Sequence, residues 1–177
     1  TCFISAPAQG LVYQIKSSRP FSILVHCDGA FIREKNYTEN HFTLTGICPG
    51  RSGLKVIKEN KPEEFLFPDE PELQGVHFIG EGCVTAGGGR ATGAADGILL
   101  EHVTGVEIRM AIRTSFRGFD KAYTEQYSDT QIRHMLAADL EKLSRPFEEL
   151  LDEHVEEYRS FYGRTSLRLW DDVPKIS

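Results

Sequence analysis

The chain has 177 residues, of which 40% are apolar and 26% charged, and its formal net charge is −6. This length suits one domain or slightly more, with enough apolar residues for a buried core. Lysines and arginines are scattered in an acidic chain, so no basic stripe is present that could neutralise a nucleic-acid backbone, and we exclude that class of partner.

The sequence contains no run of 18 apolar residues, which excludes a membrane-spanning helix from the expected elements. Its first residues, "TCFISAPAQGLVYQI", form no secretory signal and already predict a strand, a turn and a second strand. Since the chain opens inside a predicted sheet, we expect the natural protein to begin earlier. The compartment, cytoplasmic or secreted, stays open.

Residues 1 to about 118 predict β-structure. Apolar residues alternate with polar ones in "HFTLTGICPG" and in the segment that places Val106, Ile108, Met110 and Ile112 on one face. Turn signals separate these runs, including Asp28-Gly29 and the glycines at 87–89. Short strands at this spacing predict an antiparallel sandwich.

The four cysteines stand in apolar or strand-like surroundings, at positions Cys2, Cys27, Cys48 and Cys83. Because no C-x-x-C spacing occurs, we expect no zinc site and no other metal site. Buried free thiols are favoured, while the sequence leaves a disulfide open.

A long excursion of 50–74 interrupts the strands, with three prolines and many charges. A loop of this length in a compact domain is usually functional or disordered, and both alternatives remain open here. Its acidic cluster "PDEPE" suits solvation better than ligand contact.

The periodicity then changes from two residues to that of a helix. A first helix is predicted by the stripe Ile132, Met135, Leu136 and Leu140, with Ser128 or Asp129 as its N-cap. A second helix is predicted from Ser144 as N-cap to Gly163, and its stripe contains Phe147, Leu150, Leu151, Val155, Tyr158 and Phe161 or Tyr162. A short alternating strand, "RTSLRLW", is predicted after it.

The usual catalytic patterns are missing from the sequence. The paired glutamates of the second helix are neighbours on a solvated face and cannot face each other across a glycosidic bond. The histidines form no H-x-H or H-E-x-x-H pattern, and no G-x-S-x-G motif occurs. The glycine-rich "TAGGGRATGAADG" lacks the P-loop lysine, which favours a hairpin turn. We therefore expect no cofactor and nominate no catalytic residue.

The segment "RTSFRGFDKAY", residues 113–123, is the most unusual part of the chain. Aromatic rings beside cationic side chains favour a carbohydrate or inter-domain contact, for which the candidates are Arg113, Phe116, Phe119 and Asp120. A loop pinned to the core by its aromatic residues is the alternative, and it stays open.

This segment and the two helices after it resemble glycoside hydrolase family 95, the α-L-fucosidase-like enzymes. In that family a strand ends T-S-F-N-G-F-D-K, and a helical linker follows with the pattern F-x-x-L-x-x-x-H-x-x-D-Y-x-x-L-F-x-R-V-S-L-x-L-G. The matching positions here are Thr114, Ser115, Phe116, Gly118, Phe119, Asp120 and Lys121, then Phe147, Leu150, His154, Tyr158, Phe161, Arg164, Ser166, Leu167 and Leu169.

Earlier strands resemble the same family in the same order, so the resemblance covers nearly the whole chain. "FTLTGICPG" is similar to its strand before a long loop, and "GVHFIGEGCVTAGGG" to its next strand and turn. The chain departs from the family at Arg117, where asparagine is usual, and at Ala8 and Gly10. The resemblance implies two parts, a β-sandwich portion over 1–122 and a helical linker with a terminal strand over 123–177.

The resemblance implies that the parent enzyme hydrolyses terminal α-linked L-fucose with inversion, by residues of an (α/α)6 barrel that would follow this chain. We therefore expect a non-catalytic sandwich and linker, whose partners are that barrel and a fucosylated glycan. The alternatives are a carbohydrate-binding module and a protein-interaction module. Pairing between copies through exposed strand edges is a further expectation.

Overall fold

The computed structural model describes residues 1–49, 75–121, 125–164 and 166. The loop of 50–74, expected to be either functional or disordered, and the expected terminal strand around Leu167 and Trp170 lie outside these residues. What is described is mainly antiparallel sheet followed by two helices, which confirms the predicted fold class.

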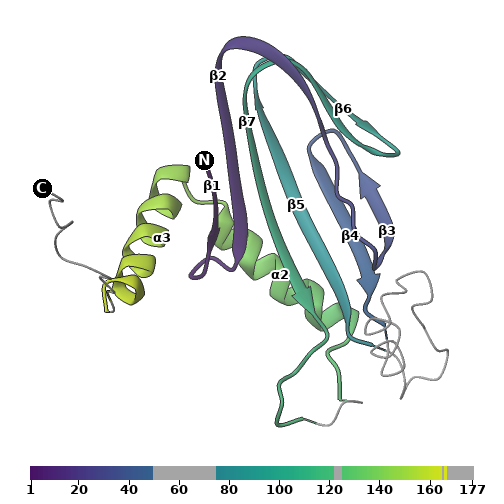
Figure 1. The fold of residues 1–177 in the computed structure, drawn as a ribbon. Helices are drawn as coiled ribbons and strands as arrows, with labels where there is room; N and C mark the ends of the chain where they lie inside the picture. The colour runs from purple at the N-terminus through teal and green to yellow at the C-terminus, as the bar shows by residue number, and fades with distance from the viewer. Residues whose placement is uncertain (50–74, 122–124, 165, 167–177) are drawn as a thin grey trace, which may run out of the picture.

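Seven strands in the described part form one antiparallel sheet in the order β1-β2-β7-β5-β4-β3, with β6 paired to β7 (Figure 1). Their bounds are β1 Cys2–Ser5, β2 Gly10–Val25, β3 Ile32–Tyr37, β4 His41–Ile47, β5 His77–Gly87, β6 Arg90–Ala94 and β7 Gly97–Thr114. The two longest strands, β2 and β7, pair with each other, and β7 also pairs with β5 and β6.

The two faces of the sheet differ in what covers them, because successive side chains of a strand point to opposite sides. On one face, Val12, Ile79 and Ala111 join a core with the helices. On the other face, Val84 and Val106 join a second core made by strands alone. The predicted apolar face therefore holds for Val106, Ile108 and Met110, whereas Ile112 is 49% exposed and joins neither core.

The second core exists because β2 and β7 bend and return over their own sheet (Figure 1). The pairing register shifts between Lys16 and Phe21 of β2, and on β7 His102 takes a positive φ of 55°. Extra residues on one strand of a pair increase bending and twist. Beyond the bend, the Cys27 N–H donates to the hydroxyl of Tyr37, 2.8 Å away, so the end of β2 reaches β3. The result is a sandwich-like double layer.

Helix α2, Asp129–Leu143, begins with the predicted cap. The Ser128 hydroxyl accepts from the N–H of Gln131, whose side chain accepts in turn from the N–H of Ser128, which completes a capping box. The buried residues of α2 are Ile132, Leu136, Asp139 and Leu143. They pack on the sheet face that carries Val12, Ile79 and Ala111.

Helix α3, Phe147–Tyr162, begins at a different residue from the one predicted. Ser144 is the C-cap of α2 and not the N-cap of α3, because its hydroxyl donates to the Glu141 carbonyl and its N–H points the same way. Pro146 occupies the N-cap of α3 and offers no side-chain acceptor. Gly163 is the C-cap, as predicted.

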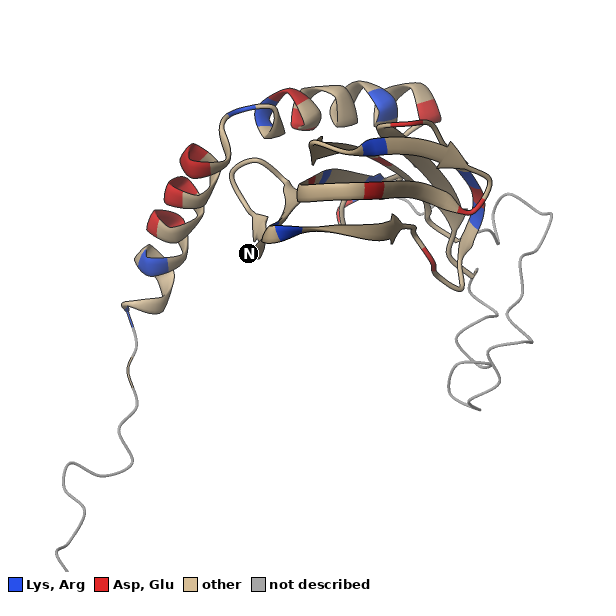
Figure 2. Cartoon of the chain, turned by 90° about the horizontal axis from the view of Figure 1, so that it is seen from above, with Lys and Arg blue, Asp and Glu red and all other residues tan. Residues whose placement is uncertain are grey.

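Only the first half of α3 rests on the sheet. The ring of Phe3 in β1 packs edge-on against Phe147 at 5.8 Å and stacks with His154 at 4.9 Å between centroids. The later turns of the helix lie away from the sheet edge (Figures 1 and 2). Among the described residues, part of the predicted apolar stripe therefore has no surface beneath it.

All four cysteines are free thiols, as the sequence favoured, but Cys2 is exposed and the other three are half-buried. Neither described helix has the length and apolar character needed to cross a membrane.

Candidate functional site

The junction between sheet and helices is fixed by Ser115, which follows the last residue of β7 and is fully buried. Its N–H donates to the carbonyl of His77 at 2.8 Å, and its hydroxyl accepts from the N–H of His77 at 3.1 Å. The same hydroxyl donates to the Gln126 amide oxygen at 2.5 Å. The chain thus leaves the sheet through a fully hydrogen-bonded joint.

Two phenylalanines project beyond this joint. Phe116 and Phe119 pack edge-to-face with centroids 5.1 Å apart, and their exposed fractions are 45% and 100%. Beside them Asp120 pairs with Lys121 at 3.1 Å on the surface. A fully exposed phenylalanine is unusual, because it leaves a large apolar ring in water.

The surface around these rings is a platform and not a pocket. The adjoining cavity measures only about 30 Å³, which is the volume of one water molecule. Gly118 takes a φ of 118° there, which suits glycine and sets the sharp turn between the two rings. Such a platform can stack on a sugar ring or on an apolar patch of a protein.

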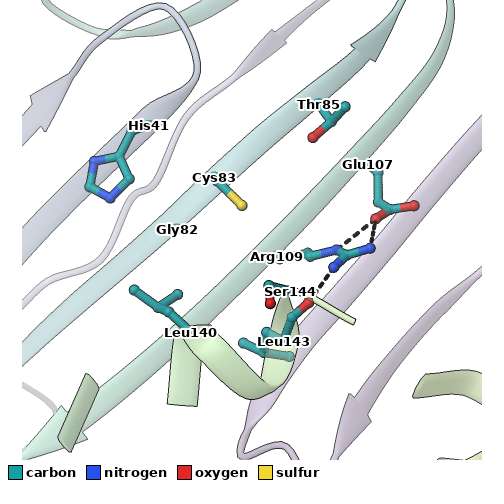
Figure 3. Close-up of a pocket in the computed structure, with 9 residues that line it drawn as sticks. All are labelled: His41, Gly82, Cys83, Thr85, Glu107, Arg109, Leu140, Leu143 and Ser144. Atoms are coloured by element: carbon teal, nitrogen blue, oxygen red, sulfur yellow. Dashed lines mark hydrogen bonds and ion pairs between the residues drawn. The ribbon is translucent and has the colours of Figure 1, made fainter. Parts of the chain in front are cut away.

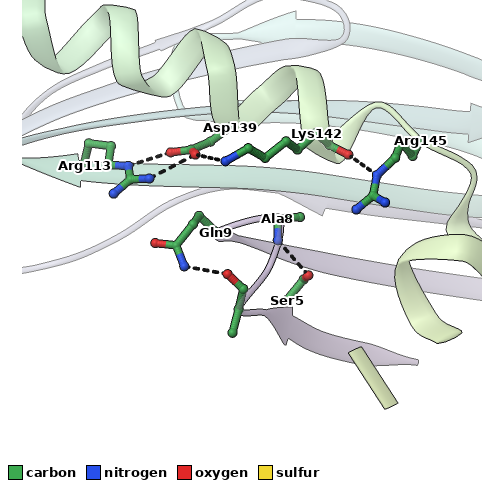
Figure 4. A network of polar contacts seen from close by, with 8 residues as sticks. Ser5, Ala8, Gln9, Arg113, Asp139, Lys142 and Arg145 are labelled. Atoms are coloured by element: carbon green, nitrogen blue, oxygen red, sulfur yellow. Dashed lines mark hydrogen bonds and ion pairs between the residues drawn. The ribbon is translucent and has the colours of Figure 1, made fainter. Parts of the chain in front are cut away.

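Arg113 does not join this platform, although the sequence grouped it with Phe116 and Phe119. It points under α2, where its guanidinium donates to both carboxylate oxygens of Asp139 at 2.5 and 3.0 Å (Figure 4). The Asp139 carboxylate is 2% exposed and also contacts Lys142 at 3.5 Å. The hydrogen bond to Asp139 raises the pKa of Arg113, and the contact ties α2 to β7.

A larger cavity of about 480 Å³ lies between the end of α2 and the sheet (Figure 3). Leu140 and Leu143 form its apolar wall, and β4, β5 and β7 form its floor. Its lining residues are His41, Gly82, Cys83, Thr85, Glu107, Arg109, Leu140, Leu143 and Ser144.

The charged residues of this cavity neutralise each other. Glu107 accepts from the Arg109 Nε at 2.6 Å and from the Gln14 amide at 2.9 Å. Arg109 also donates to the carbonyl of Leu143, at the negative end of α2, and to that of Arg145 just beyond the helix. Glu107 and Arg109 therefore hold the helix end in place and are not free for a ligand.

Cys83 is the remaining group of chemical interest in the cavity, opposite His41 in the β4–β5 register. Burial raises the pKa of the Cys83 thiol, outweighing the nearby charge of Arg109, which lowers it. A nucleophilic cysteine needs the opposite shift, because the thiolate is the reactive form. The cavity can take a small ligand with an apolar body but offers it no activated nucleophile.

A serine, a histidine and an aspartate also meet at the junction, with His77 Nδ1 3.1 Å from the Asp129 carboxylate. Ser115 cannot act as a nucleophile there, since it is fully buried and its hydroxyl proton is given to Gln126. Within the described residues, no cluster of three or more histidine, cysteine, aspartate or glutamate side chains is arranged to hold a metal ion.

Sequence reasoning found the exposed aromatic pair but missed the cavity residues. Glu107 and Arg109 alternate with the apolar residues of β7, so their shared polar face was visible in the sequence. Nothing local indicated that the end of α2 would cover that face. Asp139 was missed for the same reason, because it lies in an otherwise ordinary helical stripe.

No protein-family model matches this chain, and no curated protein matches it either.

Proposed function

We propose that this chain is the non-catalytic sandwich and linker region of an α-L-fucosidase-like glycoside hydrolase. Its role is that of a scaffold, in which the sheet is the folded base and the two helices link it to a catalytic barrel. In such an enzyme the barrel supplies the general acid and the activated water that hydrolyse the fucosyl linkage with inversion. No residue of this chain is assigned to that chemistry.

The main support is how the residues of the family-like pattern are used. Ser115 of the "TSF" segment is the buried joint at which the chain leaves the sheet. In the linker pattern, Leu150 is fully buried and His154 stacks on Phe3, so these residues dock the helix. Tyr158 and Phe161 of the same pattern are exposed, which suits a surface supplied by another domain.

The proposal is tested by activity and by complementation. Incubated with 2′-fucosyllactose or an aryl α-L-fucoside, the isolated chain should release no fucose above the buffer blank, while a known α-L-fucosidase serves as positive control. Fucose release by the isolated chain would overturn the scaffold role. A fusion of this chain to the barrel that the proposal places after it should hydrolyse α-L-fucosides. Deletion of the sheet from that fusion should lower the thermal stability of the fused protein.

A second candidate function is carbohydrate binding, and the fully exposed Phe119 favours it. Aromatic rings beside charged side chains commonly stack on sugars, and Phe119 with Phe116 forms such a platform. Calorimetry with fucosylated oligosaccharides tests this function. Binding by the isolated chain that Phe119→Ala abolishes and Phe161→Ala preserves would establish a binding module in place of a scaffold.

A further inference from the structure

A continuous row of aromatic rings runs from the sheet edge out along α3. Phe3 stacks with His154 at 4.9 Å, His154 meets Tyr158 at 6.2 Å, and Tyr158 stacks with Tyr162 at 5.4 Å between centroids. Aromatic rings at these separations attract each other beyond the area they bury. The row is therefore an ordered feature that begins as an internal contact between β1 and α3.

The outer part of this row has no cover among the described residues. Tyr158, Phe161 and Tyr162, which we call the distal patch, are 54%, 58% and 71% exposed. They continue the stripe whose inner members, Leu150 and Phe147, belong to the core. The same side of the helix thus passes without a break from an established interface to an open one.

The rest of α3 is strongly acidic. Its own residues include six carboxylates and one arginine, Arg159, so the helix has a formal charge of −5. One of the carboxylates, that of Glu153, is already paired with Arg145 just before the helix. Figure 2 shows the acidic positions on successive turns of the helix, followed by a basic position near its end. The carboxylates are Glu148, Glu149, Asp152, Glu153, Glu156 and Glu157.

Cations already occupy ring faces at both ends of the stripe. The guanidinium of Arg164 lies 4.7 Å from the Phe161 centroid, and the ammonium of Lys16 lies 5.9 Å from that of Phe147. These cation–π contacts show that positive groups fit beside the rings. A surface that covers the distal patch would meet aromatic rings and carboxylates together.

We propose that the distal patch docks a protein helix whose apolar stripe is flanked by arginines or lysines. The apolar stripe would cover the three rings, and the flanking cations would pair with the carboxylates and the ring faces. A second copy of α3 is disfavoured as the occupant, because it would bring −5 against −5. This inference goes beyond the proposed function, since it describes the covering surface whether or not that surface belongs to a glycosidase.

The test uses two labelled synthetic helices that share one leucine stripe and differ only in the flanking residues, arginine in one and glutamate in the other. Fluorescence anisotropy measures their binding to the whole chain. The arginine peptide should bind at least tenfold more tightly than the glutamate peptide. Tyr158→Ala combined with Tyr162→Ala should weaken its binding at least tenfold, while circular dichroism reports that the fold is kept.

Leu24→Ala is the matched control, since it removes an apolar side chain that is 48% exposed near the end of β2, away from the β1 strand that α3 contacts, and it should leave the affinity unchanged. Equal binding of both peptides, or unchanged binding by the Tyr158/Tyr162 double variant, would overturn the proposal. Sedimentation equilibrium tests whether a second copy of the chain covers the distal patch instead. A wild-type dimer that becomes monomeric in the double variant would show this and would overturn the proposal. Fucosidase activity of the parent has no influence on these readouts.

Discussion

Helices α2 and α3 have nearly the same length but opposite relations to the sheet. α2 buries four residues and ends in a side-chain network, whereas α3 buries only Leu150, although its apolar stripe is the cleaner of the two. α2 also buries the carboxylate of Asp139, because that group forms an ion pair with Arg113 of β7. An amphipathic pattern therefore predicts that one helix face will be buried. Whether the chain itself covers that face depends on the other elements of the fold.

The largest expected difference between the helices is in core packing. Leu136→Ala in α2 removes a fully buried side chain and should lower the free energy of unfolding by about 3 kcal/mol. Phe161→Ala in α3 removes a larger but exposed ring and should change it by less than about 0.5 kcal/mol. Urea unfolding measures both variants. Equal losses would mean that the distal half of α3 is covered within the isolated chain.

The ion pair beneath α2 should give the next largest effect. Arg113→Met leaves the buried Asp139 carboxylate with Lys142 alone and should cost about 2 kcal/mol, because an incompletely paired buried charge is destabilising. Arg133→Met is the matched control, since its pair with Glu81 is exposed on the arginine side and should contribute less than about 1 kcal/mol. Thermal unfolding compares them. If Arg113→Met left the stability unchanged, the ion pair with Asp139 would not stabilise the fold. Arg113 would then again be a candidate for the contact surface with Phe116 and Phe119.

The N-caps should differ by a smaller amount. Ser128→Ala removes the capping box of α2 and should cost about 1 kcal/mol. Pro146→Ala removes no side-chain acceptor from α3 and should change stability by less than about 0.5 kcal/mol. Chemical denaturation of the two variants checks the order, and the reverse order would contradict the assigned caps.

The smallest effect concerns thiol reactivity on the two sides of the molecule. Cys83 lies under the end of α2 and burial raises its pKa, whereas Cys2 is exposed on the strand beside α3. A raised pKa means less thiolate at a given pH, so the rate of Cys83 alkylation by iodoacetamide should rise at higher pH than for a free cysteine. Mass spectrometry across pH 7–10 should find Cys2 modified first. Earlier modification of Cys83 would show that the cavity opens.

Much of the fold was predictable because it depends on local periodicity. The alternation around Val106 and Ile108 placed one face of β7, and Ser128 marked the start of α2. What could not be predicted depends on contacts between distant residues, such as Asp139 with Arg113 or Phe3 with His154. The start of α3 was misplaced because Ser144 suits either helix end, and its hydroxyl caps the carbonyl of Glu141.

In the candidate site, too, local features could be predicted from the sequence and contacts between distant residues could not. The exposure of Phe116 and Phe119 could be expected from a short aromatic turn, but the separation of Arg113 from them could not. One residue of offset along β7 turns a side chain to the opposite face of the sheet. Arg113 and Ser115 point toward the helix face, and the chain leaves the sheet before Phe116, so adjacency in sequence did not mean adjacency in space.

The pairing of β2 with β7 also determines when the sheet can be completed during synthesis. Gln14 and Glu107, joined across that pair, are 93 positions apart, so the partner of β2 emerges from the ribosome long after β2 itself. Until then β1 pairs with only the first residues of β2, Gly10 to Tyr13, and the rest of β2 has neither of its final neighbours. Closing so long a segment makes folding slow relative to a fold of local hairpins, and the uncovered part of β2 is open to pairing with other chains during that time.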